Sequence, residues 1–206
     1  MPGPVALRSQ AVVIIPLPPD SKMIYALPRE YFQRQPLGSQ WCWVACLSMV
    51  RNARAHGEDQ CQVFAQAATL FWQAAAGYAP CPGGNIDRMA ATKSLARDEV
   101  KALWDSFGSA ASPPQGQLAA TALRAEFSAK RPSQIFVGTL DPQTGQIRNG
   151  HFVLGVGITK EGVEPAILAV ADPDPTNTDF SGYNFSEFQA AGIQLRGDWC
   201  LSWTGI

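Results

Sequence analysis

The stretch from Gln35 to Val50 constrains the fold of this chain more than any other part of its sequence. It begins polar and contains glycine, as a loop does, and then becomes an apolar run with helical spacing. The apolar residues that share one stripe of this helix are Val44, Leu47, Met49 and Val50. Because Gly38-Ser39 gives a start signal just before the helix, we expect Cys42 in its first turn, with a loop folded over it.

A cysteine in the first turn of a helix can have either of two roles. The first backbone N–H groups of a helix have no partner within the helix, and the peptide dipole is positive there. This setting favours a thiolate near neutral pH, and the N–H groups can hold a developing oxyanion. A free cysteine is also often buried as a small apolar side chain. Position alone therefore leaves Cys42 open as a nucleophile or as a core residue.

A nucleophilic cysteine needs a base, and the chain has only two histidines, His56 and His151. His56 lies fourteen residues after Cys42, which along one helix separates the two by about 20 Å. It precedes Gly57, and glycine commonly follows a helix end, so we expect His56 to be an exposed residue there. If a cysteine–histidine pair exists, its histidine is His151.

The surroundings of His151 predict a carboxylate partner. His151 follows a turn signal, Arg148-Asn149-Gly150, and opens the apolar run 152–158, which is typical of a buried strand. A second apolar run, 166–171, ends at Asp172-Pro173. An antiparallel hairpin of the two runs puts His151 opposite 172 or 173, with Cβ atoms about 4.5–5.5 Å apart. Asp172 could thus hold the imidazole, although a turn-closing aspartate before a proline is the alternative interpretation.

A cysteine at a helix start, a histidine at a strand start and a carboxylate across the hairpin form a nucleophile, a base and an orienting group. With the residues around it, this set resembles the papain-like cysteine proteases, and the resemblance extends from about Gln35 to the C-terminus. It is closest to bacterial groups that include effector proteases and relatives of bacteriocin-leader peptidases. The runs that carry it are Gln40-Trp41-Cys42-Trp43-Val44-Ala45, Gly150-His151-Phe152-Val153-Leu154 and Val170-Ala171-Asp172-Pro173.

The resemblance implies that Cys42 is the nucleophile, His151 the general base and later acid, and Asp172 the residue that orients His151. It also implies a glutamine upstream of the cysteine as an oxyanion donor. Gln35, which is followed by a proline as in many relatives, is the better match although it lies one residue farther away than usual; Gln40 is the alternative. The reaction would be hydrolysis of a peptide bond in a protein or peptide substrate through a thioester, without a cofactor.

Two other kinds of function are compatible with the same residues. A papain-fold amidase, deamidase or acyl transferase would use the same cysteine and histidine. Its substrate would be an isopeptide bond or an amide bond in a molecule that is not a protein. A catalytically inert binding module would keep Cys42 as a core residue, which a thiol-reactive probe would not label rapidly at neutral pH.

The composition argues against several classes of partner. The 206 residues include 16 Lys and Arg against 17 Asp and Glu, with no basic cluster of the kind that binds nucleic acid or anionic membranes. No apolar run approaches the roughly 18–20 residues that span a bilayer. The start lacks the basic-then-apolar order of a cleavable secretory signal. We therefore expect no nucleic-acid partner and no membrane insertion; the resemblance to effectors is compatible with cytoplasmic synthesis followed by specialised export.

The order of the predicted elements indicates an α+β fold of papain-like type, with an N-terminal helical lobe that carries the nucleophile helix and a C-terminal lobe of antiparallel sheet. Residues 1–30 are proline-rich and form an arm or extension, and residues 31–206 form the peptidase domain. We predict helices over 42–56, 59–76, 86–107 (one or two), 117–130 and 185–191, strands over 11–15, 135–140, 152–158, 166–171 and 199–203, and a turn at 141–145.

The other cysteines have less definite roles. Cys46 lies one turn after Cys42 on the same helix and is expected in the core. Cys61 and Cys81 are either a disulfide or two unrelated thiols, and relatives with a Trp-Cys-Trp helix often carry cysteines at similar places. Cys200 is expected to be buried in the last strand. No cysteines or histidines have the spacing of zinc ligands, so we expect no metal site.

Overall fold

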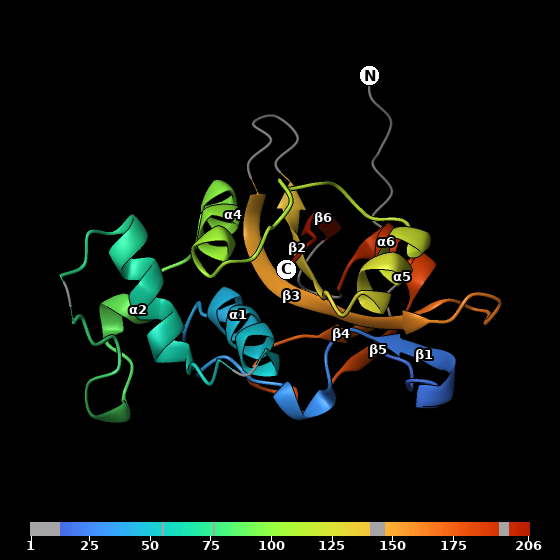
Figure 1. Cartoon of the computed structure of the whole chain (residues 1–206), viewed down its shortest axis with the longest axis horizontal. Coiled ribbons are helices and arrows are strands. Elements are labelled where there is room, and N and C mark those ends of the chain that lie inside the picture. The colour runs from blue at the N-terminus through green and yellow to red at the C-terminus, as the bar shows by residue number, and fades with distance from the viewer. Residues whose placement is uncertain (1–12, 55, 76, 141–146, 194–197) are drawn as a thin grey trace, which may run out of the picture.

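The computed structural model is an antiparallel sheet with helices packed on both of its faces (Figure 1). It describes residues 13–54, 56–75, 77–140, 147–193 and 198–206. The helices are α1 (Cys42–Ala53), α2 (Gln60–Phe71), α3 (Arg88–Ala91), α4 (Arg97–Ser106), α5 (Ala120–Ser128) and α6 (Phe185–Ala191). The strands are β1 (Met23–Tyr25), β2 (Ser133–Leu140), β3 (Ile147–Thr159), β4 (Ile167–Ala171), β5 (Ser181–Asn184) and β6 (Asp198–Trp203). The predicted α+β class is confirmed.

The sheet has the strand order β5-β4-β3-β2-β6, and β1 also pairs with β3. β3 is the long central strand, and its side chains alternate between two cores. Phe152 and Leu154 join the core that contains α1, whereas Val153 joins the core formed with α5 and α6. A strand that is buried on both faces has a nearly continuous apolar sequence, which is the pattern seen from Phe152 onwards.

Helix α1 is buried on every side over most of its length. All residues from Cys42 to Val50 are buried, including the polar Ser48. The predicted single apolar stripe was therefore too narrow, because the helix is enclosed between the sheet and the other helices of the N-terminal half. In Figure 1, α1 lies below the left part of β3, α2 lies farther to the left, and α5 lies above the right part of β3. A helix enclosed in this way has its N-terminus fixed by packing on several sides.

Two short strands, β1 and β5, were missed by the sequence analysis. β1 lies within the predicted arm and pairs with β3, while β5 pairs with β4 at the edge of the sheet. Of the predicted strand 11–15, Ile15 forms an isolated bridge with Gly182 in β5, while 11 and 12 lie outside the described residues. The predicted turn at 141–145 also lies outside them. A division of the chain at residue 30 stays a prediction.

Three helices end at least two residues earlier than predicted, and two of these ends show a clear cause. In α2, Gln73 adopts a φ of 54° and the Ala74 N–H donates to the Ala68 carbonyl, which closes the helix before the predicted end at 76. Lys130, with a φ of 59°, terminates α5 in the same way. Helix α1 also stops short, at Ala53. The region 86–107 was predicted to hold one or two helices, and it holds two, α3 and α4.

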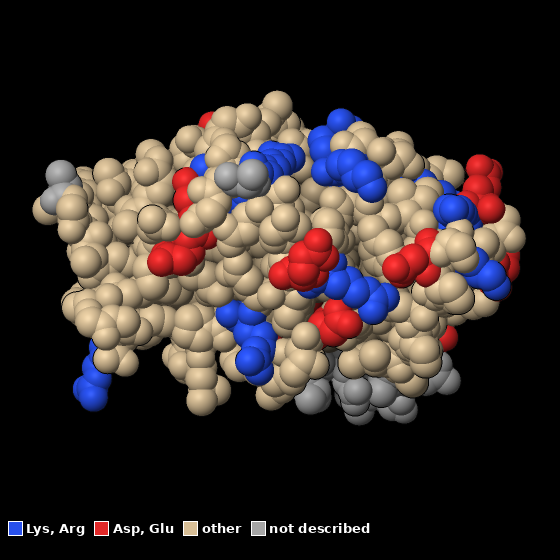
Figure 2. All heavy atoms as spheres, turned by 60° about the horizontal axis from the view of Figure 1, so that its bottom comes forward, with Lys and Arg blue, Asp and Glu red and all other residues tan. Residues whose placement is uncertain are grey.

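Two features concern the predicted absence of nucleic-acid binding and of membrane insertion: the charges on the surface and the lengths of the helices. On the face shown in Figure 2, Lys and Arg side chains lie interspersed with Asp and Glu, and most of the surface carries neither. Within the described part of the chain, no helix is both long enough and apolar enough to cross a membrane.

Candidate active site

Cys42, His151 and Asp172 meet where three elements end or cross. Cys42 is the first residue of α1, after Trp41 at the N-cap position. His151 lies on β3 and pairs with Val137 of β2. Asp172 directly follows the last residue of β4. Although the three residues are far apart in sequence, the packing of α1 against the sheet and the pairing of β3 with β4 bring them together.

The contacts within this group are short and buried. The His151 Nε2 atom lies 2.6 Å from Asp172 Oδ1, and both side chains are buried. The backbone N–H of Phe152 donates to the Cys42 sulfur over 3.5 Å. Since Nε2 is taken by the carboxylate, the Nδ1 atom of His151 is the ring nitrogen left to face the thiol. A carboxylate, an imidazole and a thiol in series can generate and use a sulfur nucleophile.

The protonation of His151 reflects these neighbours. Burial alone lowers the pKa of His151, but hydrogen bonds with Asp172 and Cys42, together with their negative charges, outweigh it and raise the pKa from 6.5 to about 9. At neutral pH the imidazole is thus held in its charged form, the form that stabilises a thiolate beside it. By contrast, burial raises the pKa of the Cys46 thiol well above its usual value.

The register of the hairpin differs from the predicted one. Leu154 pairs with Ala171, so His151 does not lie directly opposite 172 or 173, and the predicted register was wrong by one to two residues. Near the turn Gly157 pairs with Ala169, which centres the hairpin on Val163, too far along the chain for His151 to face 172 or 173. The irregularity between Gly155 and Gly157 moves the pairing back toward the predicted register by only one residue. His151 and Asp172 make contact nevertheless, beyond the last pair of the ladder.

The predicted turn before His151 is also wrong. Residues 148–150 belong to β3, which begins at Ile147 because it continues to pair with β2 there. Gly150 has a different reason to be glycine: a Cβ atom at this position would overlap the ring of Phe136. That ring packs against Phe152, with the ring centroids 4.6 Å apart. The glycine before His151 thus lets two aromatic rings pack beside it.

The two candidate glutamines have different surroundings. Gln35 is partly buried; its Nε2 donates to the Ser39 carbonyl over 2.7 Å, and its buried Oε1 has no hydrogen-bond partner. Its backbone N–H donates to the Pro173 carbonyl over 2.7 Å, which ties it to the residue after Asp172. The side chain of Gln40 is exposed. A primary amide has two N–H donors, so the bond to Ser39 leaves one for a ligand.

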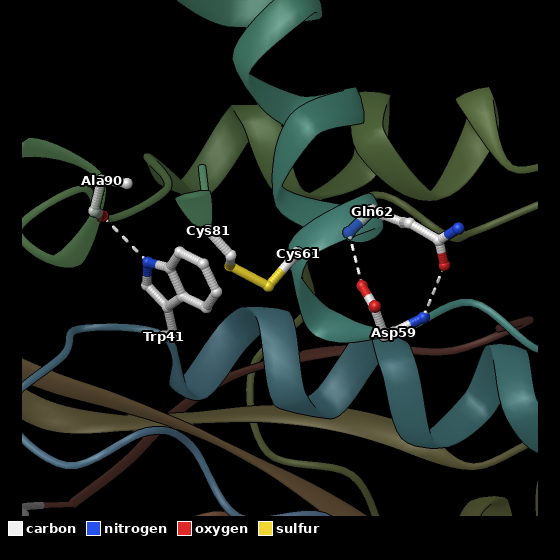
Figure 3. Close-up of a disulfide and its surroundings, with 6 residues drawn as sticks. All are labelled: Trp41, Asp59, Cys61, Gln62, Cys81 and Ala90. Atoms are coloured by element: carbon white, nitrogen blue, oxygen red, sulfur yellow. Dashed lines mark hydrogen bonds between the residues drawn. A yellow bond between two sulfur atoms is a disulfide. The ribbon is translucent and has the colours of Figure 1, made fainter. Parts of the chain in front are cut away.

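Aromatic packing and a disulfide secure the start of α1 (Figure 3). The Trp41 indole donates to the Ala90 carbonyl over 2.8 Å and stacks on Phe64 of α2, with ring centroids 4.7 Å apart. Cys61 and Cys81 form a disulfide and pack against the same core cluster as Trp41. Of the two alternatives for these cysteines, the structure therefore has the disulfide.

The remaining cysteines and the second histidine take no part in this group. Cys46 is fully buried in the core, as predicted. Cys200 lies in β6 as predicted but is only partly buried, because its strand is at the edge of the sheet. His56 is exposed after the end of α1, as expected. Sequence reasoning missed Asn177, whose side chain contacts the Asp172 carbonyl, since nothing in the local sequence marks it.

The sequence profile of a family described as the papain-like cysteine protease AvrRpt2 matches residues 24–191. This range covers most of the chain and includes all three residues of the group and both glutamines. The chain belongs to this family. A search of curated proteins finds no match. Membership of the AvrRpt2 family confirms the resemblance to papain-like cysteine proteases, identifies the chain as one of a cysteine peptidase family and implies a protein substrate.

Proposed function

We propose that the chain hydrolyses peptide bonds with Cys42 as nucleophile, His151 as general base and acid, and Asp172 as the residue that orients His151. The observation that carries this proposal is the contact of 2.6 Å between His151 Nε2 and Asp172 Oδ1. The Cys42 sulfur lies in the same buried group, where it accepts a hydrogen bond from the backbone N–H of Phe152, the residue after His151. The raised pKa of His151, to about 9, agrees with an imidazolium paired with a thiolate.

The reaction would proceed in two steps. The Cys42 sulfur attacks the carbonyl carbon of the scissile bond, and a tetrahedral oxyanion forms. His151 gives its proton to the leaving amine, so the C–N bond breaks and a thioester remains on Cys42. A water molecule then loses a proton to His151 and attacks the thioester, which releases the carboxylic acid and regenerates the thiol.

The oxyanion would be held by two kinds of donor. The backbone N–H of Cys42 lies at the start of α1, where helix geometry leaves N–H groups available. Gln35 is the proposed side-chain donor rather than Gln40, because its side chain is partly buried and its backbone N–H is bonded to the Pro173 carbonyl, next to Asp172, while Gln40 is exposed. Donors fixed in place before the reaction stabilise developing charge without further reorganisation.

The test uses labelled casein as substrate and iodoacetamide as thiol probe. Cys42→Ala should abolish casein hydrolysis and the rapid alkylation near neutral pH while leaving the unfolding temperature close to that of the unchanged chain. Cys200→Ala is the matched control, because it removes a partly exposed thiol from β6, at the edge of the sheet, and should leave turnover unaffected. Hydrolysis that persists in Cys42→Ala would exclude the proposed nucleophile.

A further inference from the structure

The placement of Asp172 depends on contacts made after its strand has ended. The pairing of β3 with β4 stops at Ala171, and Pro173 has no N–H with which to continue a ladder. The carbonyl groups of Asp172 and Pro173 therefore need partners from outside the sheet. They find them in Asn177 and in the loop that begins at Gln35.

Asn177 provides the partner of the first carbonyl. Its Nδ2 donates to the Asp172 carbonyl oxygen over 3.2 Å, from five residues along the chain. A backbone carbonyl can only accept, so the amide nitrogen is the atom of Asn177 that faces it. The Asn177 backbone N–H also donates to the Asp174 carbonyl over 3.0 Å, which folds the segment 172–177 back on itself. The side chain thus closes a turn whose first residue carries the carboxylate.

The turn 172–177 contacts both the Asp172–His151 pair and the loop that begins at Gln35. On one side, Asp172 Oδ1 accepts from the Asp174 N–H over 2.9 Å and contacts His151. On the other side, the Pro173 carbonyl accepts from the Gln35 N–H over 2.7 Å, and Arg34 donates to the Pro175 carbonyl over 3.3 Å. A shift of this turn would therefore move the carboxylate and the glutamine loop together.

We propose that Asn177 is a positioning residue. It fixes the turn 172–177 so that the Asp172 carboxylate contacts His151 and the loop that begins at Gln35 keeps its place beside Pro173. The proposal rests on the function proposed above, since it assigns Asn177 a role through those residues. Asn177 acts through the backbone of Asp172 and is not itself a catalytic residue. Misplacement of a catalytic group by about 1 Å can cost on the order of a hundredfold in rate, so a single supporting hydrogen bond can matter.

The first readout is the titration of His151, followed by NMR of the two histidine rings in the full chain. In Asn177→Ala the Asp172 carboxylate is held less firmly, so the pKa of His151 should fall by at least about half a unit relative to the unchanged protein. The ring signals of His56, an exposed residue after the end of α1, serve as the internal reference and should be the same in both proteins. An unchanged titration of His151 would overturn the proposal, and this readout does not depend on any peptidase activity.

The second readout is casein hydrolysis. Asn177→Ala should lower kcat at least about tenfold with little change in KM, because Asn177 positions the machinery rather than the substrate. Asn177→Asp keeps the shape but cannot donate, so it should lose kcat as well; full activity in this variant would overturn the hydrogen-bond argument. Thr178→Ala, an exposed neighbour, is the matched control. Absence of Cys42-dependent hydrolysis in the unchanged protein would instead count against the proposed function, and the His151 titration would still decide the role of Asn177.

Discussion

The Cys61–Cys81 disulfide allows a quantitative prediction about the stability of the N-terminal half. Cys61 lies in the first turn of α2, where Asp59 and Gln62 form a capping box, and Cys81 lies in the segment that follows the helix (Figure 3). The bond closes a loop with a sequence separation of 20 residues. By the chain-entropy relation, a cross-link over a loop of this length stabilises the folded state by about 3 kcal/mol.

The perturbation is the double variant Cys61→Ser, Cys81→Ser, measured by urea unfolding and by heating. We expect the free energy of unfolding to fall by about 3 kcal/mol. For a chain of this size each 1 kcal/mol corresponds to roughly 2–4 °C, so Tm should fall by roughly 6–12 °C. The unchanged protein treated with dithiothreitol should behave like the double variant, because both lack the same cross-link.

The control for this experiment is Cys200→Ser, which removes a sulfur that takes no part in a disulfide. Its stability should stay within about 1 kcal/mol of the unchanged protein. A double variant as stable as the unchanged chain, together with no effect of dithiothreitol, would refute the reasoning that the cross-link restricts the unfolded state.

Three further predictions concern the site and the opposite core. Gln35→Ala should lower kcat for casein about 100-fold by removing an oxyanion donor, while Gln40→Ala should have little effect; the reverse result would exchange their roles. The His151 imidazolium loses its proton as pH rises through its pKa of about 9, so the plot of Cys42 alkylation rate against pH should change slope near that pH. Asp172→Asn removes a carboxylate that raises this pKa, so the change of slope should move to lower pH. Phe127→Ala, fully buried in the core formed with α5, should cost about 3–5 kcal/mol in urea unfolding, and a smaller loss would contradict close packing there.

The sequence was most informative where local pattern and chemistry agreed. The start of α1 at Cys42 could be predicted because a loop with glycine and serine gives way to an apolar run there. His151 could be chosen over His56 by elimination, since helix geometry placed His56 too far away. The contact with Asp172 followed from the lengths of two apolar runs, although the register was wrong because the hairpin is centred later in the chain than those lengths indicate, and the irregularity near Gly155 corrects this only in part.

Features that depend on distant partners could not be predicted in this way. β1 and β5 are short, and each becomes a strand only by pairing with a longer neighbour, β3 or β4. With five cysteines, the sequence could not decide whether Cys61 and Cys81 pair, since their proximity depends on how the segment after α2 folds back. The hydrogen bond from Asn177 to the Asp172 carbonyl belongs to a turn that also contacts a segment more than a hundred residues earlier.

The enclosure of α1 has a consequence for how this protein tolerates change. A helix with one exposed side shows a 3.6-residue rhythm of permissive positions in a deep mutational scan. From Cys42 to Val50 every side chain is surrounded, so the scan should show an unbroken block of intolerance instead. Variation that alters which proteins are cleaved would then have to accumulate in the loops around this helix, while the helix itself changes little.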